Sequence, residues 1–232
     1  IAANAYRYLG DIYSRLDRLP RALRLYDFAL KIRTEDALIH YRKGMTHWGN
    51  GGVDQAGSAL DRALELDPRG DFFLARGNLY FEQGEFDEAE TAYEQGLDEG
   101  GGDVELRLWI NLGRARTELG EQSEALRAYE KALGFDPSSE LRYKIHMNRG
   151  ALLHEQQNYS AAAREFSLAN ELDATVEALY NLGLARAEDG NLDGAVEALR
   201  QARSRSPGDG EILTDLGQTY QQQGDYQNAI QY

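Results

Sequence analysis

The fold of this chain is decided by residues 109–137, whose sequence is WINLGRARTELGEQSEALRAYEKALGFDP. The landmarks of this stretch are two glycines, two alanines around a tyrosine, and a closing Asp-Pro pair: Gly113, Gly120, Ala125, Tyr129, Ala132 and Asp136-Pro137. The first glycine stands among apolar residues at helical spacing, and the second marks a turn. Proline cannot continue a helix, so the closing pair marks a helix end. The stretch predicts a helix, a short turn and a second helix.

The same landmarks recur along the whole chain. Helix glycines stand at Gly10, Gly44, Gly77, Gly113, Gly150, Gly183 and Gly217. Each is followed twelve residues later by an alanine: Ala22, Ala56, Ala89, Ala125, Ala162, Ala195 and Ala229. Successive glycines are 34, 33, 36, 37, 33 and 34 residues apart, and a period in this range is typical of a stacked repeat protein.

The repeat glycines predict a close contact between the two helices of each unit. A glycine inside a helix costs about 1 kcal/mol relative to alanine, so seven at one register need a common compensation. We expect a second helix to approach there, with the alanine as the matching small residue, so that Gly150 faces Ala162. A large and another small residue follow on that helix: Tyr26 and Ala29, Leu60 and Ala63, Tyr93 and Gly96, Tyr129 and Ala132, Phe166 and Ala169, Leu199 and Ala202.

Turn signals lie where a helical hairpin needs them. A second glycine follows the first by seven residues in five repeats, at Gly51, Gly84, Gly120, Gly190 and Gly224. A helix stop in the left-handed conformation is expected there. Asp17 and Gln157 occupy this position in the other two repeats. Pro20 is expected in the first turn of a helix, and Asp67-Pro68 and Ser206-Pro207 close their repeats as Asp136-Pro137 does.

The pattern resembles the tetratricopeptide repeat family over essentially the whole chain. Besides residues 109–137, the motif is matched by Asn78-Leu79-Tyr80, by Gly84-Glu85-Phe86-Asp87-Glu88-Ala89 and by Tyr93. The resemblance implies an all-α fold, a right-handed superhelical solenoid of antiparallel helix hairpins. We expect a single array over residues 1–232, with repeats at approximately 3–36, 37–69, 70–103, 106–139, 143–176, 176–209 and 210–232, the last one truncated.

Two repeats depart from the family pattern. Lys43 and His47 stand where a large apolar residue is usual, and the run Gly100-Gly101-Gly102 replaces a closing Asp-Pro pair before a helix expected to start at Asp103. We expect local changes in stacking there. Because the chain starts at Ile1 and ends at Tyr232 without a polar capping helix, we expect it to be a piece of a longer array.

The composition limits the classes of partner. The 232 residues carry a net charge of −14 and a pI of about 4.7, which argues against nucleic acid and anionic membranes as partners. A solvated acidic outer face is the simplest explanation of this charge. No apolar run approaches the length of a membrane span. The absence of cysteine excludes disulfides and thiolate metal sites, and leaves a cytoplasmic or a periplasmic location open.

No catalytic or metal-binding constellation is recognisable. His40 and His47 lie seven residues apart on one predicted helix, without a third ligand and without a zinc-type spacing. The Gly100-Gly101-Gly102 run follows a helix and contains no lysine, unlike a phosphate-binding loop. We therefore expect no catalytic residue, no metal, no cofactor and no enzymatic activity.

The candidate binding residues lie beside the glycine stripe on the first helix of each repeat. Residues three before, one after and four after the glycine share one helix face, and the resemblance implies that this face lines a concave groove. The candidates are Tyr41, Met45, Trp48, Leu74, Asn78, Phe81, Arg107, Ile110, Asn111, Arg114, Met147, Asn148, Tyr180, Asn181 and Leu184. Apolar surface on a soluble protein usually marks a binding site; the alternative is that neighbouring repeats bury part of this stripe.

Three asparagines stand two residues before the glycine in successive repeats: Asn111, Asn148 and Asn181. An amide both donates and accepts, so it can hold a peptide main chain of any sequence. This resembles the asparagine ladder in the tetratricopeptide domain of O-linked N-acetylglucosamine transferases; the alternative is a role within the helix. Arg107 and Arg114 would favour acidic side chains. The carboxylate clamp of chaperone-tail-binding family members needs a lysine three before the glycine, and none stands there.

We therefore expect a non-catalytic interaction module that holds a peptide or protein segment along repeats two to six. Two alternatives stay open: a self-assembling scaffold, in which arrays associate through their ends or outer faces, and a substrate-recruiting accessory domain of a larger enzyme. The partner itself is not identified by the sequence.

Overall fold

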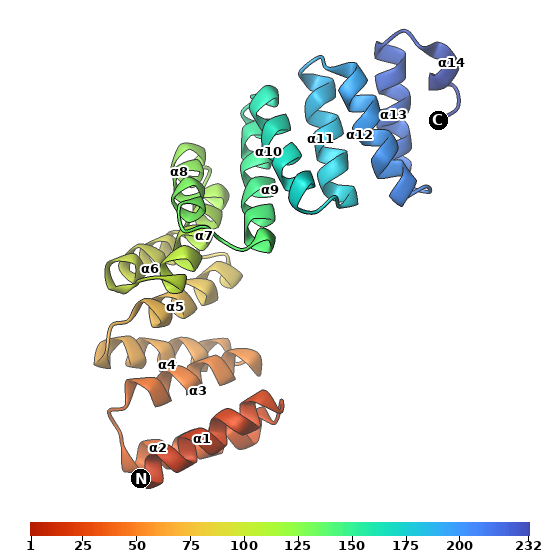
Figure 1. Cartoon of the computed structure of the whole chain (residues 1–232). Helices are drawn as coiled ribbons and strands as arrows, with labels where there is room; N and C mark the ends of the chain where they lie inside the picture. The colour runs from red at the N-terminus through yellow and green to blue at the C-terminus, as the bar shows by residue number, and fades with distance from the viewer. The chain divides into compact units, whose positions relative to one another are not determined.

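The computed structural model describes residues 1–232 and consists of fourteen α-helices without any strand. The contacts between helices divide the chain into two compact units, residues 1–128 and residues 129–232, with the boundary inside α8. Figure 1 shows the helices in chain order. The all-helical hairpin fold is confirmed, and the single continuous array stays a prediction.

Unit 1 consists of antiparallel helix pairs joined by short turns (Figure 1). The helices are α1 (Ala2–Arg15), α2 (Leu19–Ile32), α3 (Ala37–Gly49), α4 (Val53–Leu66), α5 (Gly70–Gln83), α6 (Phe86–Glu99), α7 (Asp103–Glu118) and the first part of α8 (Gln122–Leu133). Helix α7 starts at Asp103, as predicted. Pro20 lies in the first turn of α2, where the missing N–H leaves no bond unmade.

Unit 2 repeats this construction after the end of α8. Its helices are α9 (Ser139–Glu155), α10 (Tyr159–Leu172), α11 (Val176–Glu188), α12 (Leu192–Arg205), α13 (Gly210–Gln222) and the short α14 (Tyr226–Ala229). Polar side chains cap several of these helices, because they accept hydrogen bonds from backbone N–H groups that lack a partner in the first turn. Thr175, for example, accepts from the amide of Ala178 at 3.0 Å.

The turns between paired helices have the predicted left-handed residue. The five turn glycines have φ between 77° and 82°. Asp17 and Gln157, which replace glycine in two repeats, adopt the same conformation with φ of 56° and 60°. The register of the repeats is therefore correct even where the glycine signal is missing.

The close contact at the repeat glycines is present, and the large residue of the second helix comes nearest; the backbone of the expected alanine also lies close in two repeats, since a Cβ atom on Gly44 would lie 3.2 Å from the oxygen of Ala56 and one on Gly217 3.6 Å from that of Ala229. A Cβ atom on Gly77 would lie 2.5 Å from Cε1 of Tyr93, and one on Gly150 would lie 2.6 Å from Cε1 of Phe166. The glycine thus makes room for the large residue of the second helix. The prediction that Gly150 faces Ala162 was wrong, because the Phe166 ring fills the space above the glycine.

The first helices of successive hairpins line the inner side of the bend within each unit. Helix α1 contacts α3, α3 contacts α5, and α5 contacts α7 in unit 1, while α11 contacts α13 in unit 2. Neighbouring second helices, such as α2 and α4 or α10 and α12, make no comparable contact. The residues beside the glycine stripe are therefore placed on the inner side of each unit.

Substitution of Gly150 by valine tests the glycine contact. Gly150→Val forces two methyl groups against the Phe166 ring, and such overpacking lowers the free energy of unfolding by about 1–3 kcal/mol. Chemical denaturation followed by circular dichroism measures the change. Ala151→Val is the matched control, because Ala151 is the next residue of α9 and is exposed; it should change stability by about 0.5 kcal/mol or less. Equal stability of the two variants would contradict the close contact.

Candidate functional site

The candidate site is the first-helix face, defined as the residues three before, one after and four after each repeat glycine, together with Arg107 and the three asparagines two before the glycine, Asn111, Asn148 and Asn181. In unit 1 the residues at the three glycine-related positions are Arg7, Asp11, Ser14, Tyr41, Met45, Trp48, Leu74, Asn78, Phe81, Ile110, Arg114 and Thr117. In unit 2 they are Met147, Ala151, His154, Tyr180, Leu184, Ala187, Thr214, Gln218 and Gln221. Each unit presents its own first-helix face.

Two aromatic side chains of unit 1, Trp48 and Phe81, are half-buried and held in place by contacts with charged and aromatic side chains. The indole Nε1 of Trp48 donates to Oε2 of Glu82 at 2.7 Å, which links α3 to α5. The ring of Phe81 packs edge-on against Phe86, with 5.2 Å between ring centroids. The guanidinium carbon of Arg114 lies 4.5 Å from the centroid of Phe81. These contacts hold both aromatic rings in place, which favours binding because little side-chain freedom remains to be lost.

Tyr41 lies among charged groups at the start of α5 and α7. Its ring stacks on the buried ring of Phe72, with centroids 4.5 Å apart and planes at 18°. Burial raises the pKa of the Tyr41 hydroxyl and nearby Asp71 raises it further, whereas Arg42, Arg107 and Arg69 act in the opposite direction. The hydroxyl is therefore neutral at physiological pH and lies within electrostatic range of three arginines.

A hydrogen-bond network at Asn78 joins two hairpins. Oδ1 of Asn78 accepts from the hydroxyl of Tyr93 at 2.9 Å and from Nδ2 of Asn111 at 2.8 Å. Burial raises the pKa of Tyr93, so its hydroxyl stays a donor. The first asparagine of the expected ladder is thus engaged within the protein. This network was not predicted from the sequence.

A signal for this network exists in the sequence. The residue after the repeat glycine and the tyrosine fifteen positions later form the same bond in repeat one, where the Tyr26 hydroxyl donates to Oδ1 of Asp11 at 2.8 Å. An aspartate or asparagine directly after the repeat glycine, together with a tyrosine fifteen positions later, therefore predicts this hydrogen bond.

The other two ladder asparagines have free amides. Asn148 and Asn181 are half-buried on α9 and α11, and their side chains make no hydrogen bond with the protein. On the same face, the Tyr180 hydroxyl donates to Oδ2 of Asp215 at 2.6 Å and links α11 to α13. Leu184 is half-buried on the same helix, one turn after Tyr180.

Two candidate residues are not available at the surface. Leu74 is 3% exposed and Met147 is 8% exposed, because both pack into the cores between hairpins. They lie beneath the first-helix face, so the prediction that these two side chains line the groove was wrong. Tyr41, Met45 and Ile110 are half-buried, in line with the alternative that neighbouring repeats cover part of the stripe.

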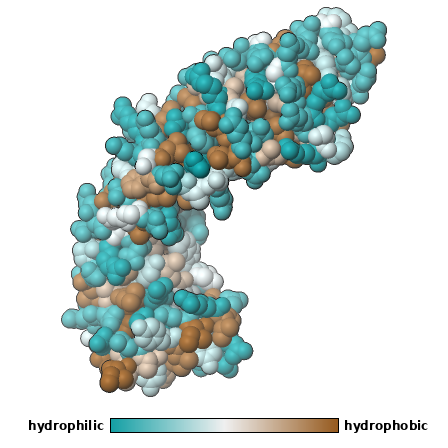
Figure 2. Space-filling view, in the orientation of Figure 1, coloured by the Kyte–Doolittle hydropathy of each residue, from teal (hydrophilic) through white to brown (hydrophobic).

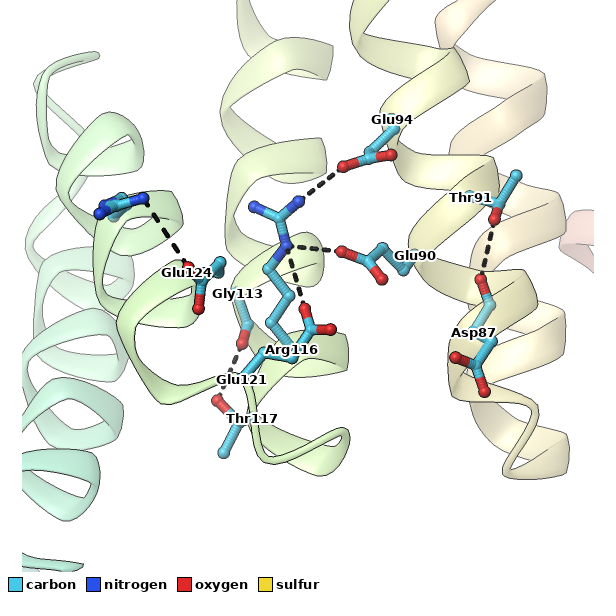
Figure 3. Close-up of polar contacts among 10 residues, drawn as sticks. Asp87, Glu90, Thr91, Glu94, Gly113, Arg116, Thr117, Glu121 and Glu124 are labelled. Carbon is cyan, nitrogen blue, oxygen red and sulfur yellow. Dashed lines mark hydrogen bonds and ion pairs between the residues drawn. The ribbon is translucent and has the colours of Figure 1, made fainter. Parts of the chain in front are cut away.

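Arg107 and Arg114 are exposed, and neither forms an ion pair with a carboxylate of the protein. By contrast, Arg116 on the other side of α7 lies 2.7 Å from Glu90 and 2.6 Å from Glu94, and so fastens α7 to α6 (Figure 3). Arg116 is thus a structural arginine, whereas Arg107 and Arg114 are open to a partner.

The C-terminal half of α1 and the residue that follows it carry exposed apolar side chains, apart from the first-helix faces. Leu9, Ile12 and Leu16 are 42%, 53% and 60% exposed and share one face of the helix. In the other repeats the residue equivalent to Ile12 is at most 3% exposed, because the preceding hairpin covers it: Thr46, Leu79, Ala115, Leu152, Ala185 and Thr219. Figure 2 shows apolar surface over this N-terminal hairpin.

No group of three histidine, cysteine, aspartate or glutamate side chains lies close enough to hold a metal ion. Nε2 of His40 lies 3.0 Å from the carbonyl oxygen of Thr34, so the ring interacts with the turn that precedes α3. No helix combines the length and the apolar composition that crossing a membrane requires.

Sequence models of the tetratricopeptide repeat match residues 8–71, 41–104 and 74–140, and a further model with the same description matches residues 186–232. The chain belongs to the tetratricopeptide repeat family. Members of this family are generally non-catalytic modules that bind protein partners. The fold accordingly fits a role in protein–protein interaction or as a scaffold.

Known proteins resemble the chain at low identity. It is 22% identical over 212 residues to the BBSome complex member BBS4 of Bos taurus, covering 91% of this chain and 40% of that protein. It is 24% identical over 217 residues to DnaJ homolog subfamily C member 3 of Gallus gallus, covering 92% of this chain and 38% of that protein. The chain thus spans about 40% of the length of these curated relatives.

Among solved structures, YrrB, described as a tetratricopeptide repeat protein with an unusual peptide-binding site, matches with a TM-score of 0.69 and 24% identity. The match covers 81% of this chain and 94% of YrrB. At this identity the likeness supports the fold.

Removal of the Asn78 side chain tests which asparagines are structural. Asn78→Ala leaves the buried Tyr93 hydroxyl without its acceptor, which lowers the free energy of unfolding by about 1–3 kcal/mol. Asn148→Ala removes no hydrogen bond and should leave stability within about 0.5 kcal/mol. Denaturant titration gives both values, and adding Tyr93→Phe to Asn78→Ala should restore part of the loss. Equal losses for Asn78→Ala and Asn148→Ala would refute this division.

Proposed function

We propose that the chain is a non-catalytic module that binds a protein segment on its first-helix faces. One observation carries the proposal: polar side chains on these faces have no hydrogen-bond or ion-pair partner in the protein, and one of them, Arg114, packs against an aromatic ring. Asn148 and Asn181 have free amides, and Arg107 and Arg114 have no carboxylate partner. Such groups are suited to a ligand that lies against the face.

The two faces contribute different contacts. In unit 1, Trp48 and Phe81 offer aromatic surface for an apolar side chain of the partner, and aromatic anchors often dominate the energetics of an interface. In unit 2, the amides of Asn148 and Asn181 both donate and accept, so they suit the main chain of an extended segment whatever its sequence. Tyr180, next to Asn181 on α11, adds a half-buried aromatic side chain.

Two substitutions separate these contacts. Trp48→Ala should weaken binding of segments with an apolar anchor by about 2 kcal/mol, and should leave segments without one nearly unaffected. Asn148→Ala should weaken all segments by a similar amount of about 1 kcal/mol, because its amide contacts only main chain. Peptides selected from a random display library on the full chain serve as ligands, and calorimetry measures their affinity.

Tyr226→Ala and Gln201→Ala are the matched controls, because both side chains are exposed and lie away from the first-helix faces. Each should leave affinity unchanged. Selected peptides that bind Trp48→Ala and Asn148→Ala as tightly as the unsubstituted chain would show that these faces are not the site.

Self-association through the exposed apolar face of Leu9, Ile12 and Leu16 is a second candidate function. The exposed face of Leu9, Ile12 and Leu16 has the register that the other repeats bury against a preceding hairpin. Burial of large aliphatic side chains yields about 1.5–3 kcal/mol each, which is enough to favour association of chains through this face. A scaffold built in this way would assemble without any ligand.

Substitution of Ile12 by glutamate tests the second candidate. If α1 mediates association, the sedimentation coefficient of the chain rises with concentration, and Ile12→Glu abolishes the rise because a charge is buried in the contact. Tyr226→Glu, at an exposed position near the other end, should keep it. A concentration-independent coefficient for the unsubstituted chain would exclude this function.

A further inference from the structure

The first helices of unit 1 differ in charge from its second helices. Helices α1, α3, α5 and α7 carry eight basic and six acidic residues. Helices α2, α4 and α6 carry four basic and ten acidic residues. The first helices of unit 1 thus carry a slight positive charge in a protein whose net charge is −14.

The carboxylates nearest to this face already have partners. Asp11 accepts from Arg7 at 3.1 Å and from the Tyr26 hydroxyl at 2.8 Å. Asp71 lies 3.1 Å from Arg69. Glu82 accepts from the Trp48 indole. They leave Arg107 and Arg114 without a counter-ion, and Arg42 has only a contact of 3.9 Å to Asp11.

One of the two unpaired arginines, Arg114, lies against an aromatic ring. The guanidinium of Arg114 is positioned against the ring of Phe81, and Arg107 lies seven residues earlier on the same side of α7. An arginine that packs on a ring keeps N–H groups free in the plane of its guanidinium, and these groups match the two oxygens of a carboxylate. Unit 1 therefore presents an aromatic ring beside an unpaired guanidinium at Phe81 and Arg114, and a second unpaired guanidinium at Arg107 on the same helix.

We propose that the first-helix face of unit 1 selects an acidic protein segment in which an aspartate or glutamate lies beside an aromatic or large aliphatic residue. This rests on the proposed function and names its partner class. The carboxylates bind Arg107 and Arg114, and the apolar side chain packs on Trp48 and Phe81. The remaining negative charge of the chain repels such a segment at long range, so selection depends on close contact with the two guanidinium groups.

Charge reversal of the two arginines tests this selection. Peptides of about sixteen residues, selected from a random display library on the full chain, are expected to be enriched in aspartate and glutamate next to aromatic or aliphatic residues. The double variant Arg107→Glu/Arg114→Glu should bind these peptides at least a hundredfold more weakly, about tenfold for each charge-assisted contact. Arg107→Lys/Arg114→Lys should give an intermediate loss of affinity, because lysine keeps the positive charge but lacks the paired N–H donors of the guanidinium.

The matched control is Arg24→Glu/Arg127→Glu, which makes the same change in net charge at exposed positions of the second helices α2 and α8. It should change affinity less than threefold. Circular dichroism melting verifies that every variant folds. A single-stranded DNA 16-mer should not compete with the peptides, since DNA lacks the apolar side chain.

The outcomes separate this proposal from the proposed function. Peptides without acidic enrichment that respond to Trp48→Ala and not to Arg107→Glu/Arg114→Glu would overturn the acidic selection and leave the binding function standing. Equal losses in the double variant and its control, or competition by the DNA, would also overturn it, because the effect would then be general charge. Peptides that respond to none of these substitutions would overturn both proposals.

Discussion

The contact between the repeat glycine and the large residue of the second helix is the interaction on which the rest of the structure depends. Gly77 and Gly150 lie directly against the rings of Tyr93 and Phe166. The two helices of a hairpin therefore approach more closely than they could if the glycine position carried a side chain. The position of each first helix is thereby fixed relative to its partner. The glycine lowers helix propensity, and the packing of a buried ring of at most 2% exposure offsets this loss.

This constraint places the functional side chains. A first helix whose glycine faces its partner must present the residues one and four positions later to the inner side of the unit. Asn78 and Phe81 lie there because Gly77 faces Tyr93. The Tyr93 hydroxyl in turn reaches Asn78. The packing of a hairpin and the chemistry of its surface are therefore set by the same few positions.

The sequence predicted the fold and the turns, since glycine spacing and turn conformation are local properties. It predicted less of the site, because burial depends on neighbouring hairpins. Leu74 and Met147 have the register of surface residues but are covered by adjacent repeats. Asn111 has the same sequence context as Asn148, yet only Asn111 has an amide acceptor in the hairpin before it, at Asn78. Such differences arise from pairs of residues 33 positions apart.

Within each unit, every helix contact joins neighbouring hairpins or the two helices of one hairpin. Contacts of such short sequence separation give a low contact order, and chains of this kind fold fast because little loop entropy is lost before native contacts form. Their cooperativity is limited for the same reason: a terminal hairpin can open while the others stay folded. The opening of one hairpin can therefore leave the inner side of hairpins further along the same unit intact.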